Sequence, residues 1–192
     1  MPTDWKKVWN RKGTEDTEDL CVLNGYEKVN EKTSFCDAAV SIADNICKTM
    51  GINKDSRILE VGCGAGMLAQ HFDCNYVGVD YSESLIEKHR NILGNNVFVS
   101  EASNLPFEDK SFDFVFSFSV FHYFRDKKYV HMAISEMERV SKKSIFIGDL
   151  PINSCTTDHL LFQKEEFEGW QVSGAYYTRP DKALRFNAHR KI

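Results

Sequence analysis

The sequence has no long apolar run. Although 42% of its 192 residues are hydrophobic, no stretch approaches the roughly 20 consecutive apolar residues that a transmembrane helix needs. The first residues, Met-Pro-Thr-Asp-Trp-Lys-Lys, carry charges where a signal peptide would need an apolar stretch. The sequence therefore predicts no membrane association, a cytoplasmic location and one sizeable hydrophobic core.

Cysteine pairs at metal-binding spacing are also missing. The six cysteines stand at positions 21, 36, 47, 63, 74 and 155, without a C-x-x-C motif and without paired Cys/His spacing. This pattern argues against a metal site and against a disulfide framework, so we expect no bound metal and reduced thiols. Cys63 lies between two glycines and is interpreted as a small space-filling residue rather than a nucleophile.

An excess of positive charge is the third absence. The formal net charge is −4, and Lys and Arg occur as scattered short pairs. Because phosphate neutralisation supplies much of the affinity of nucleic-acid-binding proteins, we expect no nucleic-acid partner. The C-terminal segment is a local exception, with Arg179, Lys182, Arg185, Arg190 and Lys191. It is interpreted either as a solvated strand edge or as a patch that holds an anionic small acceptor.

The most informative segment is Arg-Ile-Leu-Glu-Val-Gly-Cys-Gly-Ala-Gly at 57–66. Its apolar start predicts a short buried parallel strand. Gly62, Gly64 and Gly66 then allow a tight turn and a close approach to a ligand, because no Cβ stands in the way. A second strand follows, and Asp80 at its end is placed to accept hydrogen bonds from both hydroxyls of a ribose. These features predict an adenosine-containing cofactor.

The glycine spacing distinguishes between such cofactors. In the nicotinamide fingerprint G-x-G-x-x-G the helix N-terminus faces a pyrophosphate, but Met67 occupies the position of the last glycine. The pattern is instead Glu60-x-Gly62-x-Gly64-x-Gly66, which resembles the first motif of the class I S-adenosylmethionine-dependent methyltransferases of type 11. The resemblance implies S-adenosyl-L-methionine as cofactor and S-adenosyl-L-homocysteine as product. The Glu60 carboxylate suits the ammonium and sulfonium charges of this cofactor.

Further signals follow in the order found in this family, over about residues 57–150. After a predicted third strand, Glu101 and Ala102 stand where the resemblance implies contacts with adenine. Ser117 belongs to the segment that leaves the fourth strand, which in this family lines the methyl-transfer site. The cofactor-binding residues implied by the resemblance are Glu60, Gly62, Cys63, Gly64, Gly66, Asp80, Tyr81, Glu101, Ala102 and Ser117.

Alternating helix and strand patterns predict an α/β fold. Apolar periodicity predicts a helix over 34–50 capped by Ser34, a helix over 83–93 that follows Ser82, and a further helix that Asp126 caps. Such alternation implies a parallel sheet with right-handed crossovers. The family resemblance adds a single Rossmann-like domain with a mostly parallel seven-stranded sheet, an antiparallel last strand from a C-terminal hairpin, and helices on both faces.

The expected domain boundary lies near residue 34. Residues 34–192 are expected to form the cofactor-binding methyltransferase domain, and residues 1–33 an N-terminal lid or cap. Trp5 and Trp9 are one helical turn apart, and with Tyr26 they are interpreted in two ways. They close the cofactor site and exclude water, or they form an aromatic stripe that packs on the core.

Methyl transfer from a sulfonium mainly requires alignment of the acceptor with the methyl carbon. A hydroxyl acceptor also benefits from a base, and His122 and Asp149 are the candidate catalytic residues. His122 is interpreted alternatively as a packing residue beside Phe121 and Tyr123, and Asp149 as a cap for the next segment.

The methyl acceptor is less determined than the cofactor. A chain of 192 residues has little room for a large recognition insert, which favours a small molecule as acceptor. The expected acceptor is a sugar or a phosphorylated metabolite, and the expected site of methylation is one of its oxygens. A second, weaker resemblance is to small bacterial methyltransferases of surface-polysaccharide modification. The alternatives are a non-catalytic cofactor-binding partner subunit and a methyltransferase acting on protein or RNA. The oligomeric state is left open.

Overall fold

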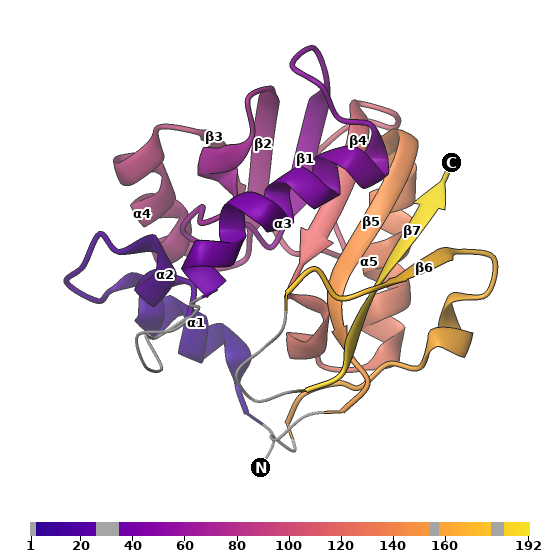
Figure 1. Cartoon of the computed structure of the whole chain (residues 1–192). Coiled ribbons are helices and arrows are strands. Elements are labelled where there is room, and N and C mark those ends of the chain that lie inside the picture. The colour runs from indigo at the N-terminus through magenta and orange to yellow at the C-terminus, as the bar shows by residue number, and fades with distance from the viewer. Residues whose placement is uncertain (1–2, 26–34, 154–157, 178–182) are drawn as a thin grey trace.

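The computed structural model describes residues 3–25, 35–153, 158–177 and 183–192 (Figure 1). Seven strands form one sheet in the order β3-β2-β1-β4-β5-β7-β6. Strands β1 to β5 run parallel, and β7 runs antiparallel to both of its neighbours. The strands are β1 (Arg57–Val61), β2 (Asn75–Asp80), β3 (Asn96–Val99), β4 (Phe112–Phe118), β5 (Ser141–Pro151), β6 (Gln171–Gly174) and β7 (Arg185–Lys191). The predicted mostly parallel sheet with an antiparallel last strand is confirmed.

Helices cover both faces of this sheet (Figure 1). Ile58 of β1 packs in the same cluster as Ile46, whereas the next residue, Leu59, packs in a second cluster with Met137. Because successive strand residues point to opposite faces, the helices that carry Ile46 and Met137 lie on opposite sides, as predicted. The helices are α1 (Trp5–Gly13), α2 (Leu20–Leu23), α3 (Phe35–Met50), α4 (Glu83–Leu93) and α5 (Lys127–Val140), with 3₁₀ turns η1 (Ala69–His71), η2 (Phe121–Tyr123) and η3 (Lys164–Phe167).

The predicted helix caps can be compared directly with the structure. The Ser82 side chain accepts a hydrogen bond from the Leu85 N–H at 3.3 Å, and Asp126 accepts one from the Tyr129 N–H at 2.7 Å. Both predicted caps are confirmed. The predicted cap Ser34 lies outside the described residues.

The N-terminal helices are packed against the body of the domain. The Ser84 hydroxyl of α4 donates a hydrogen bond to the Asn10 carbonyl at 2.7 Å, and the Ser82 hydroxyl donates one to the Asn10 side chain at 2.9 Å. A Cβ at Gly13 would collide with Ser84, so only glycine lets α1 approach α4 this closely. Movement of residues 1–33 as a lid stays a prediction, and Tyr26 lies outside the described residues.

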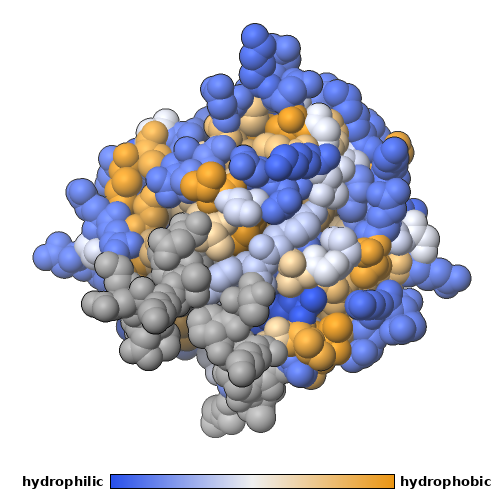
Figure 2. Space-filling model, viewed as in Figure 1, coloured by the Kyte–Doolittle hydropathy of each residue, from blue (hydrophilic) through white to orange (hydrophobic). Residues whose placement is uncertain are grey.

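The surface of the described residues is mixed in polarity. On the face shown in Figure 2, hydrophobic residues form separate patches between hydrophilic ones. Within the described ranges, no helix has both the length and the apolar character needed to cross a membrane.

The cysteines differ in their chemical state. Cys47, Cys63 and Cys74 carry free thiols, as expected. Cys21 is disulfide-bonded, so the expectation of reduced thiols is wrong at this position. A single disulfide needs no short-range spacing motif, which explains why the cysteine pattern did not indicate it.

Candidate active site

The loop after β1 turns at three glycines that all have positive φ. The φ angles are 83° at Gly62, 51° at Gly64 and 94° at Gly66, a region that side-chain-bearing residues rarely adopt. The N–H groups of Gly62 and Cys63 both donate to the Val79 carbonyl, at 2.7 and 3.0 Å. This holds the loop against the end of β2, at the sheet edge where ligands bind in open α/β folds.

Each of the three loop glycines lies close to a different side chain, which a Cβ atom at that glycine would displace. A Cβ at Gly62 would collide with Val120, and one at Gly64 with the side-chain oxygen of Asn24. A Cβ at Gly66 would stand 2.7 Å from the His89 ring. Gly66 therefore serves the packing of α4, whereas Gly62 and Gly64 face the space above the loop.

Asp80, at the end of β2, is held by the backbone. One carboxylate oxygen accepts a hydrogen bond from the Gly64 N–H at 3.0 Å, and the other accepts one from the Ser82 N–H at 2.9 Å. Burial raises the pKa of Asp80 to about 6, although these backbone hydrogen bonds oppose the rise. The carboxylate is thus fixed beside the glycine loop before any ligand binds.

Glu60 is the second carboxylate of the loop and is only 3% exposed. The Tyr76 hydroxyl donates a 2.6 Å hydrogen bond to it. Burial raises the pKa of Glu60 to about 8, because the Tyr76 bond compensates only part of the desolvation and Asp80 adds negative charge. Burial also raises the pKa of the Cys63 thiol, which fits a filling role rather than a nucleophilic one.

Glu101 follows β3 and is tied to α1 and α5. It accepts hydrogen bonds from Lys6 at 2.8 Å and from the Tyr129 hydroxyl at 2.7 Å. Burial disfavours its charged form, but these two partners outweigh that effect and keep the pKa of Glu101 below its usual value. The neighbouring Ala102 is 8% exposed.

Two cavities lie above this edge of the sheet. The first, of about 70 Å³, lies over the glycine loop and is lined by the predicted cofactor residues Glu60, Gly62, Cys63, Gly64, Asp80 and Tyr81. The second, of about 580 Å³, is lined by Tyr81 and Glu101 among others, and its size is typical of small-molecule sites. Gly66, Ala102 and Ser117 line neither cavity.

Comparison with known sequences gives a partial match. Residues 59–147 match a family described as a methyltransferase domain. The human protein named probable tRNA methyltransferase 9B is 41% identical over 86 residues, which are 44% of this chain and 19% of that protein. The O-methyltransferase cnsE of Penicillium expansum is 26% identical over 182 residues, covering 86% of this chain and 65% of that protein. The chain thus spans about a fifth of the length of the first curated relatives it matches.

Comparison with solved structures agrees on the fold. An S-adenosylmethionine-dependent methyltransferase from Methanosarcina mazei has a TM-score of 0.65 at 17% identity, covering 76% of this chain and 96% of that one. The family match and the shared fold coincide with the predicted glycine motif. This chain carries a methyltransferase domain. Its fold is that of the solved S-adenosylmethionine-dependent methyltransferase. The solved neighbour is described as S-adenosylmethionine-dependent, which agrees with the cofactor predicted from the glycine motif.

The chain's residues fit this cofactor chemically. The positively charged ammonium group and the ribose hydroxyls need hydrogen-bond acceptors, and Glu60 and Asp80 supply carboxylates on the cavity wall. Neither Lys nor Arg lines the first cavity among the described residues, as suits a cofactor without phosphate. The described residues also hold no group of three or more His, Cys, Asp or Glu side chains placed to bind a metal.

The two predicted catalytic residues of the methyltransferase domain are both buried. His122 is 1% exposed, and its ring centroid lies 4.1 Å from that of Tyr123. Asp149 is 3% exposed and forms an ion pair with Arg185 at 3.4 Å. Neither residue lines the two cavities. Their catalytic roles stay predictions.

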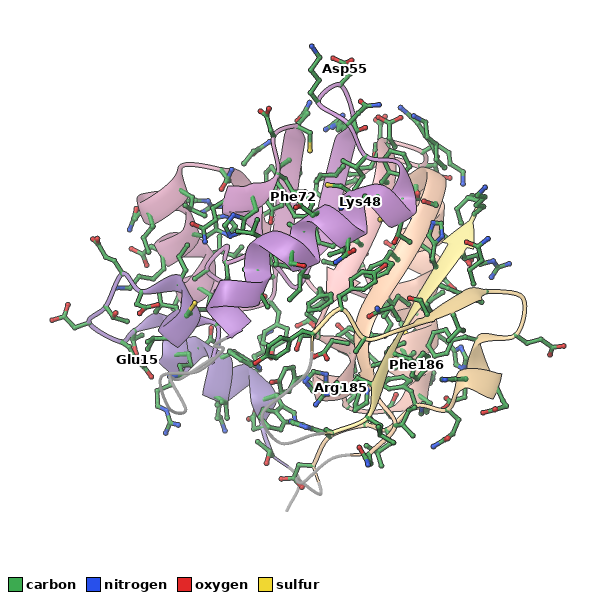
Figure 3. All side chains as sticks on the ribbon, viewed as in Figure 1. Glu15, Lys48, Asp55, Phe72, Arg185 and Phe186 are labelled. Atoms are coloured by element: carbon green, nitrogen blue, oxygen red, sulfur yellow. The ribbon has the colours of Figure 1, made fainter. Side chains whose placement is uncertain are left out.

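The basic C-terminal segment does not form one patch in the described structure. Arg185, labelled in Figure 3, is buried against Asp149 at the start of β7. Arg190, at the other end of β7, pairs with Glu138 at 2.8 Å. Arg179 and Lys182 lie outside the described residues.

Strained backbone marks the ends of β4 and β5 in the methyltransferase domain. Ser119 and Asp149 have φ angles of 59° and 61°, and the Ser119 N–H donates to the Gly148 carbonyl at 3.1 Å. Non-glycine residues in this conformation cluster at functional sites. Ser119 lines the first cavity.

The sequence did not indicate Asn24 and His159 as site residues, and it left the role of Trp5 open between closing the site and packing on the core. Trp5 and His159 line the second cavity, where their ring centroids are 5.2 Å apart. Asn24 lines the first cavity. Neither Asn24 nor His159 belongs to a motif, and both come from segments outside the region that matches the family, so only the folded chain brings them to the site.

Proposed function

We propose that the domain transfers the methyl group of S-adenosyl-L-methionine to an oxygen of a small acceptor, a sugar or a phosphorylated metabolite. One observation carries this proposal. The second cavity, of about 580 Å³, shares Tyr81, Tyr123 and Phe124 with the cavity over the glycine loop. An acceptor in the second cavity would therefore lie next to the cofactor, as direct methyl transfer requires.

The lining of the second cavity supports a neutral sugar more than a phosphorylated acceptor. Trp5 and Tyr123 offer aromatic faces, and Asp4 and Asp158 offer carboxylates that accept hydrogen bonds from hydroxyls. Lys6, one of the cations in the lining, is already paired with Glu101 at 2.8 Å. A phosphate would compete with Glu101 for this lysine.

The reaction is an in-line displacement. The cofactor supplies a methyl group on a sulfonium leaving group. A bond forms from the acceptor oxygen to the methyl carbon, the carbon–sulfur bond breaks, and its electron pair stays on sulfur. The hydroxyl proton must go to a base, and His159 is the imidazole that lines the acceptor cavity. His122 lies behind it, at 4.7 Å between ring centroids, and remains a second candidate together with Asp149.

An RNA acceptor is the second candidate function. It is favoured by the 41% identity over 86 residues to the human protein named probable tRNA methyltransferase 9B. This match covers 44% of the chain and 19% of that protein. The net charge of −4 speaks against a polyanionic acceptor.

A two-step experiment tests the proposal. Calorimetry first measures binding of S-adenosyl-L-homocysteine, and a methyl-release assay then compares neutral sugars, sugar phosphates and tRNA. We expect cofactor binding and turnover with a member of the sugar panel. Methylation of tRNA but of no sugar or sugar phosphate would show that the acceptor is RNA. Cofactor binding without turnover on any acceptor would favour a non-catalytic partner subunit.

A further inference from the structure

Asn24 stands opposite the glycine loop although it comes from the N-terminal segment. It lines the first cavity together with Glu60 and Asp80. A Cβ at Gly64 would collide with the Asn24 side-chain oxygen, so this oxygen faces the loop directly. The residue lies outside residues 59–147, the range that matches the methyltransferase family.

The orientation of the Asn24 amide is defined by a hydrogen bond within its own segment. Its nitrogen Nδ2 donates to the Leu20 carbonyl at 2.7 Å. A carbonyl only accepts, so the atom facing Leu20 must be the nitrogen and the atom facing Gly64 must be the oxygen. The cavity therefore receives an acceptor from Asn24.

The segment that carries Asn24 is anchored to the loop. Leu23 is fully buried and packs with Ala65 of the glycine loop and Leu85 of α4. The Asp19 side chain caps α2 by accepting a hydrogen bond from the Cys21 N–H at 2.9 Å. Since α2 is held at both ends, Asn24 is positioned by the core rather than left on a free tail.

We propose that Asn24 binds the amino-acid end of the cofactor, with its side-chain oxygen accepting a hydrogen bond from the cofactor's ammonium group. Two acceptors then face this cation, namely Glu60 and the Asn24 oxygen, while Asp80 is left for the ribose hydroxyls. The N-terminal segment thereby forms one wall of the cofactor site, and the site is incomplete in residues 59–147 alone.

The test compares two ligands that differ at this end of the molecule. S-adenosyl-L-homocysteine carries the amino-acid group, whereas 5′-methylthioadenosine has the same adenosine without it. By calorimetry, Asn24→Ala should weaken S-adenosyl-L-homocysteine about tenfold or more, as for hydrogen bonds to charged groups, and leave 5′-methylthioadenosine unchanged. Asn24→Asp, which keeps an oxygen acceptor, should retain most of the affinity for S-adenosyl-L-homocysteine.

Asn45 provides a matched control. Its Nδ2 donates to the carbonyl of Ser41, four residues earlier, at 2.8 Å, and it lines neither cavity. Asn45→Ala should leave both ligands unaffected, and thermal unfolding of each variant reports whether it is folded. Equal losses for both ligands on Asn24→Ala, or no loss for either, would overturn the proposal. Wild-type protein that binds neither ligand would instead refute the cofactor assignment itself.

Discussion

Two carboxylates of the glycine loop region, the buried Glu60 and the half-buried Asp80, face the cavity in which a cationic cofactor is expected. The pKa of Glu60 is raised to about 8 and that of Asp80 to about 6, chiefly by burial. Groups facing Glu60 include the Tyr76 hydroxyl, the Cys63 thiol and Asp80 itself. At neutral pH the cofactor-free site thus holds a proton on Glu60, which a bound cation would displace.

The first prediction follows from this proton. The affinity for S-adenosyl-L-methionine should rise with pH up to the Glu60 pKa of about 8, by as much as about tenfold per pH unit where one proton leaves on binding. Calorimetry across pH 6 to 9, in buffers of different ionisation enthalpy, measures both the affinity and the released proton. Glu60→Gln should flatten the profile, and an affinity that falls with rising pH would contradict the role of Glu60.

The same pKa predicts the stability of the cofactor-free protein. Folding raises the pKa of Glu60 from its ordinary value of 4.5 to about 8, chiefly through burial. Between these values the folded state keeps a proton that the unfolded chain releases, so the stabilising contribution is complete below about 4.5 and is lost as pH rises through 8. The free energy of unfolding should therefore decline over this window, and less so in Glu60→Gln. Urea unfolding at several pH values checks this, and a slope that is identical in both proteins would count against it.

Asp80 carries the next prediction. Because its carboxylate should bind the ribose hydroxyls, Asp80→Ala should weaken cofactor binding by about 1.5–3 kcal/mol. Asp73 is exposed and lines neither cavity, so Asp73→Ala is the control. Titration with NAD should show negligible affinity in all three proteins. Unchanged cofactor affinity in Asp80→Ala, or tight NAD binding, would defeat this assignment.

The two neighbouring histidines can be separated by kinetics. If His159 accepts the acceptor's proton, His159→Ala should lower turnover by about 10²–10⁴-fold with little effect on cofactor affinity. His122→Ala should then lower stability and leave the pH profile of the remaining activity unchanged. If His122 is the base, as predicted from the sequence, His122→Ala should lower turnover by this factor, and His159→Ala should leave the pH profile of the remaining activity unchanged. A flat wild-type rate from pH 5.5 to 8 would exclude a histidine base of ordinary pKa.

At the scale of elements, the loop after β1 depends on backbone geometry. Gly64→Val should abolish cofactor binding, because valine resists the φ of 51° and its side chain would collide with Asn24. Gly51 is a matched control, with a φ of 78° and no atom within 4 Å of an added Cβ. Gly51→Val should cost stability but leave cofactor affinity unchanged. Normal binding by Gly64→Val would show that the loop does not hold the cofactor.

Local sequence signals predicted the elements that carry their own caps and periodicity. The α4 helix follows Ser82 and spans Glu83–Leu93, as predicted, because cap residues act on their nearest neighbours. Gly94, in the left-handed conformation, ends it. The apolar residues Ile145, Phe146 and Ile147 mark only the middle of strand β5, which spans Ser141–Pro151. The exposed residues Lys142 and Lys143 near its start are not apolar, so hydrophobicity alone does not indicate a strand there. Hydrogen bonding to β4 and β7 extends the strand beyond its apolar centre.

The candidate site was predictable only where it rests on the glycine motif. Glu60, Gly64 and Asp80 lie close in sequence to recognisable strands and do line one cavity. Asn24 joins them in this cavity, and His159 lines the second one. Both are brought there by the packing of distant segments, which no local sequence pattern encodes.

At the scale of the whole molecule, charge separates the two candidate acceptors. The chain has a net charge of −4. If the acceptor is a neutral sugar, turnover should change less than about twofold between 50 and 200 mM salt, because no counterions are released. A polyanionic RNA acceptor would instead lose affinity steeply over this range. Initial rates at subsaturating acceptor, with cofactor in excess, make the comparison.

The placement of α1 also gives the protein a built-in optical reporter. Trp9 lines the cavity over the glycine loop and Trp5 lines the larger one, and each packs against Tyr123. The third tryptophan, Trp170, packs instead against Phe167, away from both cavities. Intrinsic fluorescence of single-tryptophan variants would therefore resolve the arrival of cofactor from that of acceptor in real time, without any label.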